Sequence, residues 1–314
     1  MTGIDAFSQL LAVLRVSQYD AWHNAQVREY PDGTTIVTVF DRAIIRERGL
    51  EAVGGERRSP DDGEAGDGGE AERPSEESRA AANLARARRR ARRAVYDYAM
   101  STDFEYFVTL TVDEKRLNRY DAGEVFRHLH NWLDNHVRRN GLTYVLVPEY
   151  HKDGAVHFHA LFNDALPVKD SGTISLPRGG KPRRPRSKAQ RAAWLAAGGH
   201  VVYNLPAWGW GFTTAIRLYG ERAAAVGYVC KYISKAEDKI GGRWYYSGGA
   251  LRGPAVTSND LDFDTACQLG DPFEVEELGC KAVKIVLKGE EVNEALERLA
   301  GAFGPVQHPS DPVV

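Results

Sequence analysis

Residues 147–162 read VPEYHKDGAVHFHALF, and this stretch decides the fold that we expect for the chain around it. Apolar and polar side chains alternate on both sides of Asp153-Gly154, a dipeptide that favours a tight turn between two strands. The stretch therefore predicts a β-hairpin, with strands over 142–150 and 155–162.

The hairpin gathers side chains of the types that bind metal ions. Residues i and i+2 of a strand face the same side, so His157 and His159 point together while Phe158 points away. A turn centred on Asp153 places Glu149 opposite His157, at a cross-strand distance of about 5 Å. Two imidazoles and a carboxylate suit a divalent cation, Mg²⁺ or Mn²⁺ where phosphate is a further ligand. The alternative is two surface histidines on a half-exposed strand.

Strands and helices alternate in the segments around the hairpin. In chain order we expect a strand over 105–112, a helix over 122–139 with Asp121 as its N-cap, a strand over 211–220 and a helix over 221–235. A polar, basic insertion over 165–200 separates the hairpin from the later strand. This order predicts an α+β fold with a central antiparallel sheet and flanking helices.

The flanking regions divide the chain into four parts. We expect a small N-terminal α/β segment over 1–53 (a helix over 4–17, a strand over 33–44), a disordered acidic linker over 54–79, the main domain over 80–250 with a basic lead-in helix over 80–100, and an acidic C-terminal extension over 251–314. The linker is rich in Gly, Asp, Glu and Pro and can bury little apolar surface.

The formal net charge of -2 conceals a strong segregation of charge along the chain. Six arginines lie within residues 86–93, and seven basic side chains without an acid lie within 178–191. Residues 55–79, by contrast, hold nine acids and four bases. Basic patches of this kind favour a polyanionic partner, although a solvated surface is the alternative.

The cysteines and the apolar runs indicate the compartment. Cys230, Cys267 and Cys280 form no C-x-x-C pair, which is typical of free thiols in a reducing cytosol. No run approaches the roughly 18 apolar residues that span a bilayer. The first residues lack the basic lead of a signal peptide. We therefore expect a cytoplasmic protein without a membrane partner.

Residues 227–235, GYVCKYISK, form a second chemically distinctive segment. On a helix at 100° per residue, one arc of about 100° carries two phenols and two ammonium groups: Tyr228, Tyr232, Lys231 and Lys235. Val226 lies with the apolar side chains on the other side. A lysine one turn from a tyrosine can stabilise the phenolate, which makes the tyrosine a possible nucleophile. The alternative is an ordinary amphipathic helix whose tyrosines cap a core.

Three motifs stand in order: FVTLT (107–111), VHFHALF (156–162) and YVCKYISK (228–235). Together they resemble the His-hydrophobe-His (HUH) endonucleases that initiate rolling-circle replication, above all the initiators of small single-stranded DNA phages and related plasmids or prophages. The resemblance covers roughly residues 100–250. It implies an HUH/RRM-like domain with the H-x-H strand central in an antiparallel sheet. It also implies a divalent ion held by His157 and His159, with Glu149 as the third ligand.

The resemblance further implies an activity and its partners. Tyr228 or Tyr232 would attack a DNA phosphodiester, assisted by Lys231 or Lys235, and leave a 5′-phosphotyrosine and a free 3′-hydroxyl. The implied function is replication initiation, by sequence-specific nicking and rejoining of single-stranded DNA at an origin. Host helicase and polymerase are expected partners, because the chain has no G-x-x-x-x-G-K-[ST] motif. The alternatives are an HUH-type single-strand transposase, a non-catalytic nucleic-acid-binding protein and a His/Glu zinc hydrolase.

Several side chains are candidates for contacts with DNA outside the site of cleavage. Arginines in the two basic segments could clamp phosphates: Arg88, Arg89, Arg90, Arg183 and Arg184. Trp208, Trp210 and Arg243 could contact bases and backbone, with core packing as the alternative for the aromatic rings. His128, His130 and His136 fall on the helix over 122–139, where we expect surface or packing roles.

Overall fold

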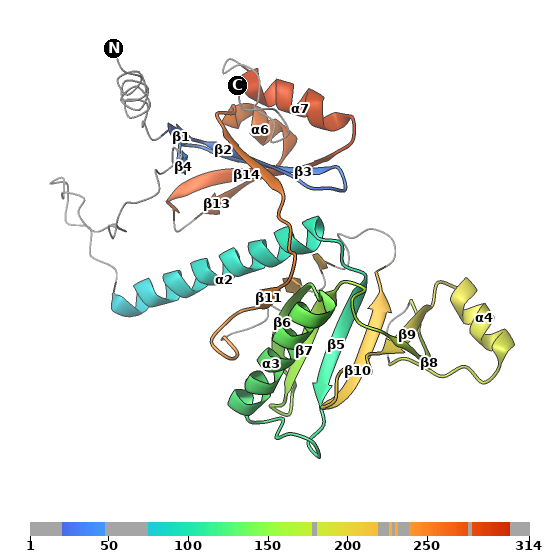
Figure 1. Cartoon of the computed structure of the whole chain (residues 1–314). Coiled ribbons are helices and arrows are strands. Elements are labelled where there is room, and N and C mark those ends of the chain that lie inside the picture. The colour runs from blue at the N-terminus through green and yellow to red at the C-terminus, as the bar shows by residue number, and fades with distance from the viewer. Residues whose placement is uncertain are drawn as a thin grey trace, which may run out of the picture. The chain divides into compact units, whose positions relative to one another are not determined.

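The computed structural model describes residues 21–47, 75–177, 181–218, 226–227, 230–231, 239–275 and 278–301. The chain divides into two compact units. A central unit spans Ala81–Pro254, and the other combines Met1–Ala80 with Ala255–Val314. The predicted hairpin belongs to the central unit (Figure 1).

The described part of the central unit contains a seven-stranded antiparallel sheet in the order β11-β6-β7-β5-β10-β9-β8. Its strands are β5 (Tyr106–Val112), β6 (Tyr144–Tyr150), β7 (Val156–Phe162), β8 (Lys169–Ser175), β9 (His200–Asn204), β10 (Gly211–Arg217) and β11 (Tyr246–Gly248). The H-x-H strand β7 lies between β6 and β5, in the interior of the sheet. The predicted α+β class with a central antiparallel sheet is confirmed.

Helix α3 (Ala122–Asn140) covers one face of this sheet. Asp121 caps its first turn, as the sequence predicted, and Gly141 ends it in the left-handed conformation at φ 72°. Its apolar stripe packs against Phe158 and Phe162 of β7 in the main core. Because alternate strand residues face opposite sides, this packing sends the odd-numbered residues of β7 to the other face.

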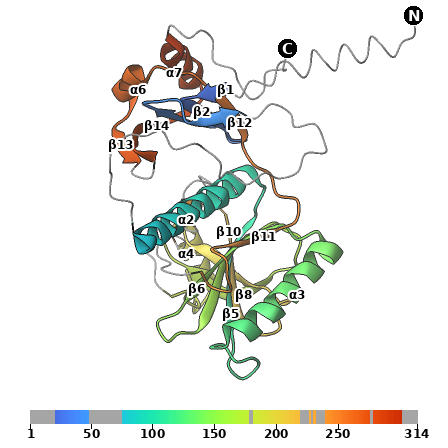
Figure 2. The same ribbon diagram turned by 90° about the vertical axis from the view of Figure 1, so that its left-hand side faces the viewer.

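Helix α2 (Glu76–Ser101) lies on the side of the sheet away from α3 (Figure 2). Val145, Val147 and Leu161 face this side and are fully buried. The helix begins at Glu76, whereas we expected it to begin at residue 80, so the last residues of the predicted linker are helical. The rest of that linker lies outside the described residues.

The basic insertion over 165–200 has regular structure, which the sequence did not predict. It contains β8, β9 and helix α4 (Lys188–Ala196), and it extends one edge of the sheet. Arg183 adds a further bridge, because its backbone exchanges two hydrogen bonds with Ile174. Ile174 and Val202 are buried, so two apolar side chains anchor this strongly basic segment.

The other unit joins the two ends of the described chain in one five-stranded sheet, in the order β12-β2-β3-β14-β13. Its strands are β2 (Ala25–Glu29), β3 (Thr34–Phe40), β12 (Ala255–Asn259), β13 (Pro272–Val275) and β14 (Cys280–Lys288). Strands β1 (Ala21–His23) and β4 (Ile45–Glu47) pair separately, and helices α6 (Phe263–Leu269) and α7 (Glu291–Ala300) share the core of this sheet.

The N-terminal and C-terminal segments, which the sequence suggested as separate parts, therefore fold together. The strand predicted over 33–44 corresponds to β3. The helix predicted over 4–17 lies outside the described residues.

The cysteines and helices agree with the composition. Cys230, Cys267 and Cys280 are free thiols, as expected, and burial raises the pKa of Cys230 to about 11. Among the helices that the structure describes, none is long and apolar enough to cross a membrane.

Candidate metal and nucleic-acid site

The hairpin has the register that the sequence predicted. Glu149 pairs with His157 across β6 and β7, and Gly154 adopts a φ of 85° in the turn. Phe158 is fully buried on the α3 side. His157 and His159 therefore share the opposite face of the sheet with Glu149.

One contact between the three predicted metal ligands is already formed. Glu149 Oε2 lies 2.9 Å from Nε2 of His159, one pair along the ladder from the residue directly opposite it. Burial lowers the pKa of His159, and the carboxylate opposes this shift only in part. Burial also lowers the pKa of His157, with help from the neighbouring His151, His159 and Arg119. Both imidazoles are therefore neutral at neutral pH, which is the form that binds metal.

Two threonines of β5 support the imidazoles from behind. Thr109 pairs with His159 and Thr111 pairs with His157 across the sheet. Their hydroxyls lie 3.3 Å and 3.4 Å from the Nδ1 atoms of these histidines. This arrangement leaves Nε2 of each ring as the atom that faces other partners. FVTLT was the least specific of the three sequence motifs, yet its alternating threonines gave the signal for this support.

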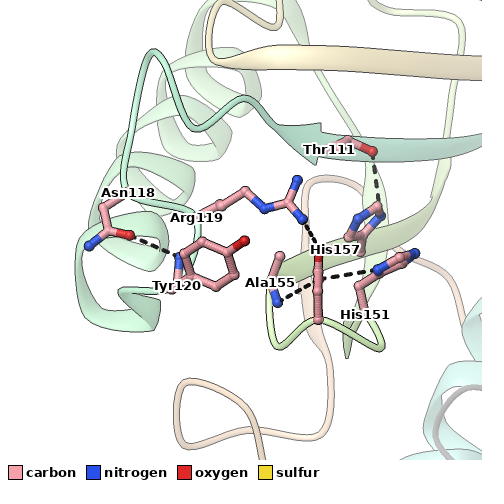
Figure 3. A network of polar contacts seen from close by, with 8 residues as sticks. Thr111, Asn118, Arg119, Tyr120, His151, Ala155 and His157 are labelled. Atoms are coloured by element: carbon pink, nitrogen blue, oxygen red, sulfur yellow. Dashed lines mark hydrogen bonds and ion pairs between the residues drawn. The ribbon is translucent and has the colours of Figure 1, made fainter.

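A polar network fixes the turn of the hairpin beside His157 (Figure 3). The ring of His151 stacks on that of His157 with centroids 5.0 Å apart. Asp153 accepts a hydrogen bond from the backbone N–H of Ala155 at 3.1 Å and contacts Nδ1 of His151 at 3.2 Å. Arg119, in the β5–α3 loop, forms an ion pair with Asp153. The turn is thereby tied to the end of β5, and the sequence gave no role to His151 or Arg119.

The donor set fits a divalent cation, although it is not yet gathered around one point. Within the described ranges, no three His, Cys, Asp or Glu side chains converge closely enough to hold an ion. The contact of Glu149 with His159 is the one that an ion would replace. Since a threonine hydroxyl can donate or accept, Thr109 can accept a hydrogen bond from Nδ1–H of His159 once Nε2 serves as a ligand.

Most of the tyrosine-bearing segment lies outside the described residues, which include Lys231 but none of the other predicted catalytic residues: Tyr228, Tyr232 and Lys235. The described positions, 226–227 and 230–231, are helical. Val226 is buried and Lys231 is exposed, as the predicted helix requires. Cys230 Sγ lies 3.8 Å from the carbonyl oxygen of Arg92 on α2. The segment therefore packs beside α2.

The predicted DNA contacts differ in exposure. Arg89 and Arg90 of α2, Arg183 and Arg184 of the insertion, and Arg243 are exposed, while Arg88 is partly buried. Trp208 is 5% exposed, and its indole donates to the carbonyl of Thr111 at 3.1 Å, so of its two alternatives it has the core-packing role. Trp210 is partly buried against the same core.

The helix histidines have the packing roles that we expected. Their rings contact aromatic neighbours: His128 contacts Trp210, His130 contacts Tyr246 and His136 contacts Trp132. They belong to α3, on the opposite side of the sheet from His157 and His159. These rings therefore take no part in the H-x-H site.

An interior H-x-H strand in an antiparallel sheet, with a carboxylate of the neighbouring strand against its imidazoles, defines the class of HUH replication proteins. Residues 105–237 match a family model described as a replication-associated protein of the ORF2 type. This part of the chain is thus a replication-associated domain, consistent with a rolling-circle initiator of the HUH superfamily. No curated protein and no solved structure matches the chain.

Proposed function

We propose that the central unit nicks and rejoins single-stranded DNA at a replication origin, through a covalent bond between a tyrosine and the 5′ phosphate. The observation that carries this proposal is the Glu149–His159 contact beside His157, in a domain of the replication-associated family. The nucleophile would be Tyr228 or Tyr232, with Lys231 or Lys235 stabilising the phenolate.

The proposed reaction exchanges one phosphate ester for another. The tyrosine oxygen bonds to phosphorus, the bond from phosphorus to the 3′ oxygen breaks, and the phenolic proton ends on the released 3′-hydroxyl. Because the number of ester bonds is unchanged, the reverse reaction rejoins a strand without an energy source. A second tyrosine would allow a new 3′ end to be joined while the first still holds a 5′ phosphate.

His157, His159 and Glu149 would hold the divalent ion, Mg²⁺ or Mn²⁺. When bound, the ion supplies Lewis-acid polarisation of the phosphate that is attacked. The contribution of the chain itself is orientation, because Thr109 and Thr111 fix both rings through Nδ1. Burial keeps the rings neutral, so no proton competes for Nε2 at neutral pH.

The placement of helices supports the assignment of the nucleophile. Helix α2 lies on the histidine side of the sheet, and Cys230 of the tyrosine-bearing segment contacts α2. The two chemically distinctive segments of the sequence are thereby on the same side of the β-sheet. The host helicase and polymerase remain proposed partners, required because the chain lacks an ATP-driven motor motif.

The test is incubation of the full chain with end-labelled single-stranded DNA and Mn²⁺, followed by a denaturing gel. We expect a covalent protein–DNA band that disappears in the double variant Tyr228→Phe, Tyr232→Phe. A matched double variant, Tyr150→Phe with Tyr203→Phe, should keep the band.

Other outcomes assign the protein to a different class. A non-catalytic binding protein would form no covalent band in any variant. A zinc hydrolase would cut DNA in the Tyr228→Phe, Tyr232→Phe variant and lose activity with His157→Ala. Either result would refute tyrosine transesterification.

A further inference from the structure

A pocket of about 290 Å³ opens beside the edge strand β11. The described residues that line it are Lys239, Gly242, Arg243, Trp244, Tyr245 and Ser247. This volume is at the lower end of the range of about 300–1000 Å³ for pockets that enclose small ligands. It suits a single nucleotide better than a longer piece of a strand.

The pocket opens on the same face of the sheet as the two metal-binding histidines. Tyr246 is buried on the α3 side, where its hydroxyl donates to the carbonyl of Gly241 at 2.7 Å. Since neighbouring residues of a strand alternate, Tyr245 and Ser247 face the histidine side. Strand β11 pairs with β6, and β6 with β7, so about 10 Å separates the edge strand from the H-x-H strand.

The chemistry of the lining is that of a site for a nucleotide. Lys239 and Arg243 are exposed and basic, and the described lining contains no acidic residue. An anionic group such as a phosphate is therefore favoured. Trp244 and Tyr245 offer aromatic surfaces, on which bases of single strands commonly stack.

One hydrogen-bond donor in the pocket lining has no partner in the described protein. Trp244 is 7% exposed, and its buried Nε1–H makes no hydrogen bond to the described residues. A buried donor without a partner costs free energy, and such groups are rare in folded proteins. A base or sugar oxygen in the pocket would satisfy this donor.

We propose that this pocket binds one nucleotide of the single-stranded substrate next to the phosphate that is cut, with Trp244 and Tyr245 against the base and Lys239 and Arg243 against its phosphate. This inference rests on the proposed function, because it takes single-stranded DNA as the substrate. It adds a subsite that positions the strand and reads a base.

Equilibrium binding in EDTA tests the pocket separately from strand cleavage. The full chain is titrated with a fluorescent oligothymidylate of about six nucleotides and with an abasic strand of the same length, followed by polarisation. Both strands carry the same phosphates, so the ratio of their dissociation constants measures the contribution of the bases. We expect Tyr245→Ala to reduce this ratio about 10- to 100-fold.

Arg243→Ala gives an independent measurement, because an exposed side chain can be removed without disturbing the fold. It should weaken both strands equally and lower the slope of log affinity against log salt by about 0.7. Arg138→Ala, which removes an equal charge at the end of α3, should change neither quantity beyond the general effect of net charge.

Two results would overturn the pocket: an unchanged base-dependent ratio in Tyr245→Ala, or the same salt slope in Arg243→Ala as in Arg138→Ala. Loss of the covalent band while oligonucleotide binding stays intact would instead refute only the proposed cleavage. The two failures are therefore distinguishable.

Discussion

The two faces of β7 illustrate how one strand serves stability and chemistry at once. Phe158 is fully buried against α3 on one face, and His157 and His159 meet Glu149, Thr109 and Thr111 on the other. Dispersion and the hydrophobic effect act on the first face, and directional polar contacts act on the second. Residues adjacent in sequence should therefore respond to mutation in different ways.

Phe158→Ala should have the largest effect on stability. Truncating a fully buried phenylalanine leaves a cavity in a well-packed core and costs about 3–5 kcal/mol. His159→Ala should cost much less free energy of unfolding but abolish the covalent DNA band. Urea denaturation followed by circular dichroism measures both variants. Equal losses of stability would show that the two faces are not functionally divided.

Removing the hydroxyls behind the imidazoles should sharpen the contrast within the polar face. Thr109→Val together with Thr111→Val keeps the side-chain volume and deletes the contacts to Nδ1. We expect Mn²⁺ affinity to fall about 10- to 100-fold, as for other groups that orient metal ligands. Titration calorimetry provides the measurement.

The matched control for this pair is Thr214→Val. Thr214 pairs with Thr109 across β10 and has no hydrogen bond to either imidazole in the described structure. It should bind Mn²⁺ like the unmodified protein. A similar loss of affinity in Thr214→Val would mean that the sheet, and not the hydroxyl contact, sets metal binding.

Asp153→Asn should have a smaller effect, confined to the turn. The pKa of Asp153 lies below its usual value, mainly because its carboxylate accepts from the Ala155 N–H, with His151 and Arg119 adding to the shift. A lowered folded-state pKa gives stability that is present above the unfolded value, near pH 4, and is lost as pH falls through the folded value.

Acid unfolding curves test this role. The free energy of unfolding of the wild type should decline more steeply below about pH 4 than that of Asp153→Asn. The variant should keep the covalent band at a rate reduced by only a few-fold. Parallel curves for the two proteins would remove Asp153 from the account of the turn.

Arg183→Ala with Arg184→Ala should produce the smallest effect, because each arginine is exposed and lies on the insertion far along the sheet order from β7. If both contact phosphates, the salt slope for single-stranded DNA should fall by about 0.7 for each contact. Arg138→Ala with Arg139→Ala removes the same charge from the end of α3. Identical slopes for the two double variants would exclude the insertion as a DNA clamp.

The sequence predicted the hairpin and its register because the information is local. Asp153-Gly154 fixes the turn, and the period of two then determines that Glu149 meets His157. The same holds for Asp121, which caps α3 at the predicted residue. Short-range rules were sufficient wherever a turn or a cap sets the geometry of its neighbours.

Features that depend on distant residues or weak patterns were not predicted. The insertion contains β8, α4 and β9, but its two buried anchors, Ile174 and Val202, are lost among basic side chains. The pairing of Val37 with Ile285 in the other unit joins positions too far apart for any local pattern to indicate. The Arg119–Asp153 ion pair likewise depends on the tertiary approach of two loops.

The five-stranded sheet takes β2 and β3 from before the central unit and β12, β13 and β14 from after it. During translation, the ribosome must therefore synthesise Ala81–Pro254 before this sheet can close, a delay of about 10–35 s at ordinary elongation rates. The replication domain can finish folding first, while two unpaired strands wait for their partners. Nascent chains stalled before β12 should accordingly bind chaperones through these early strands.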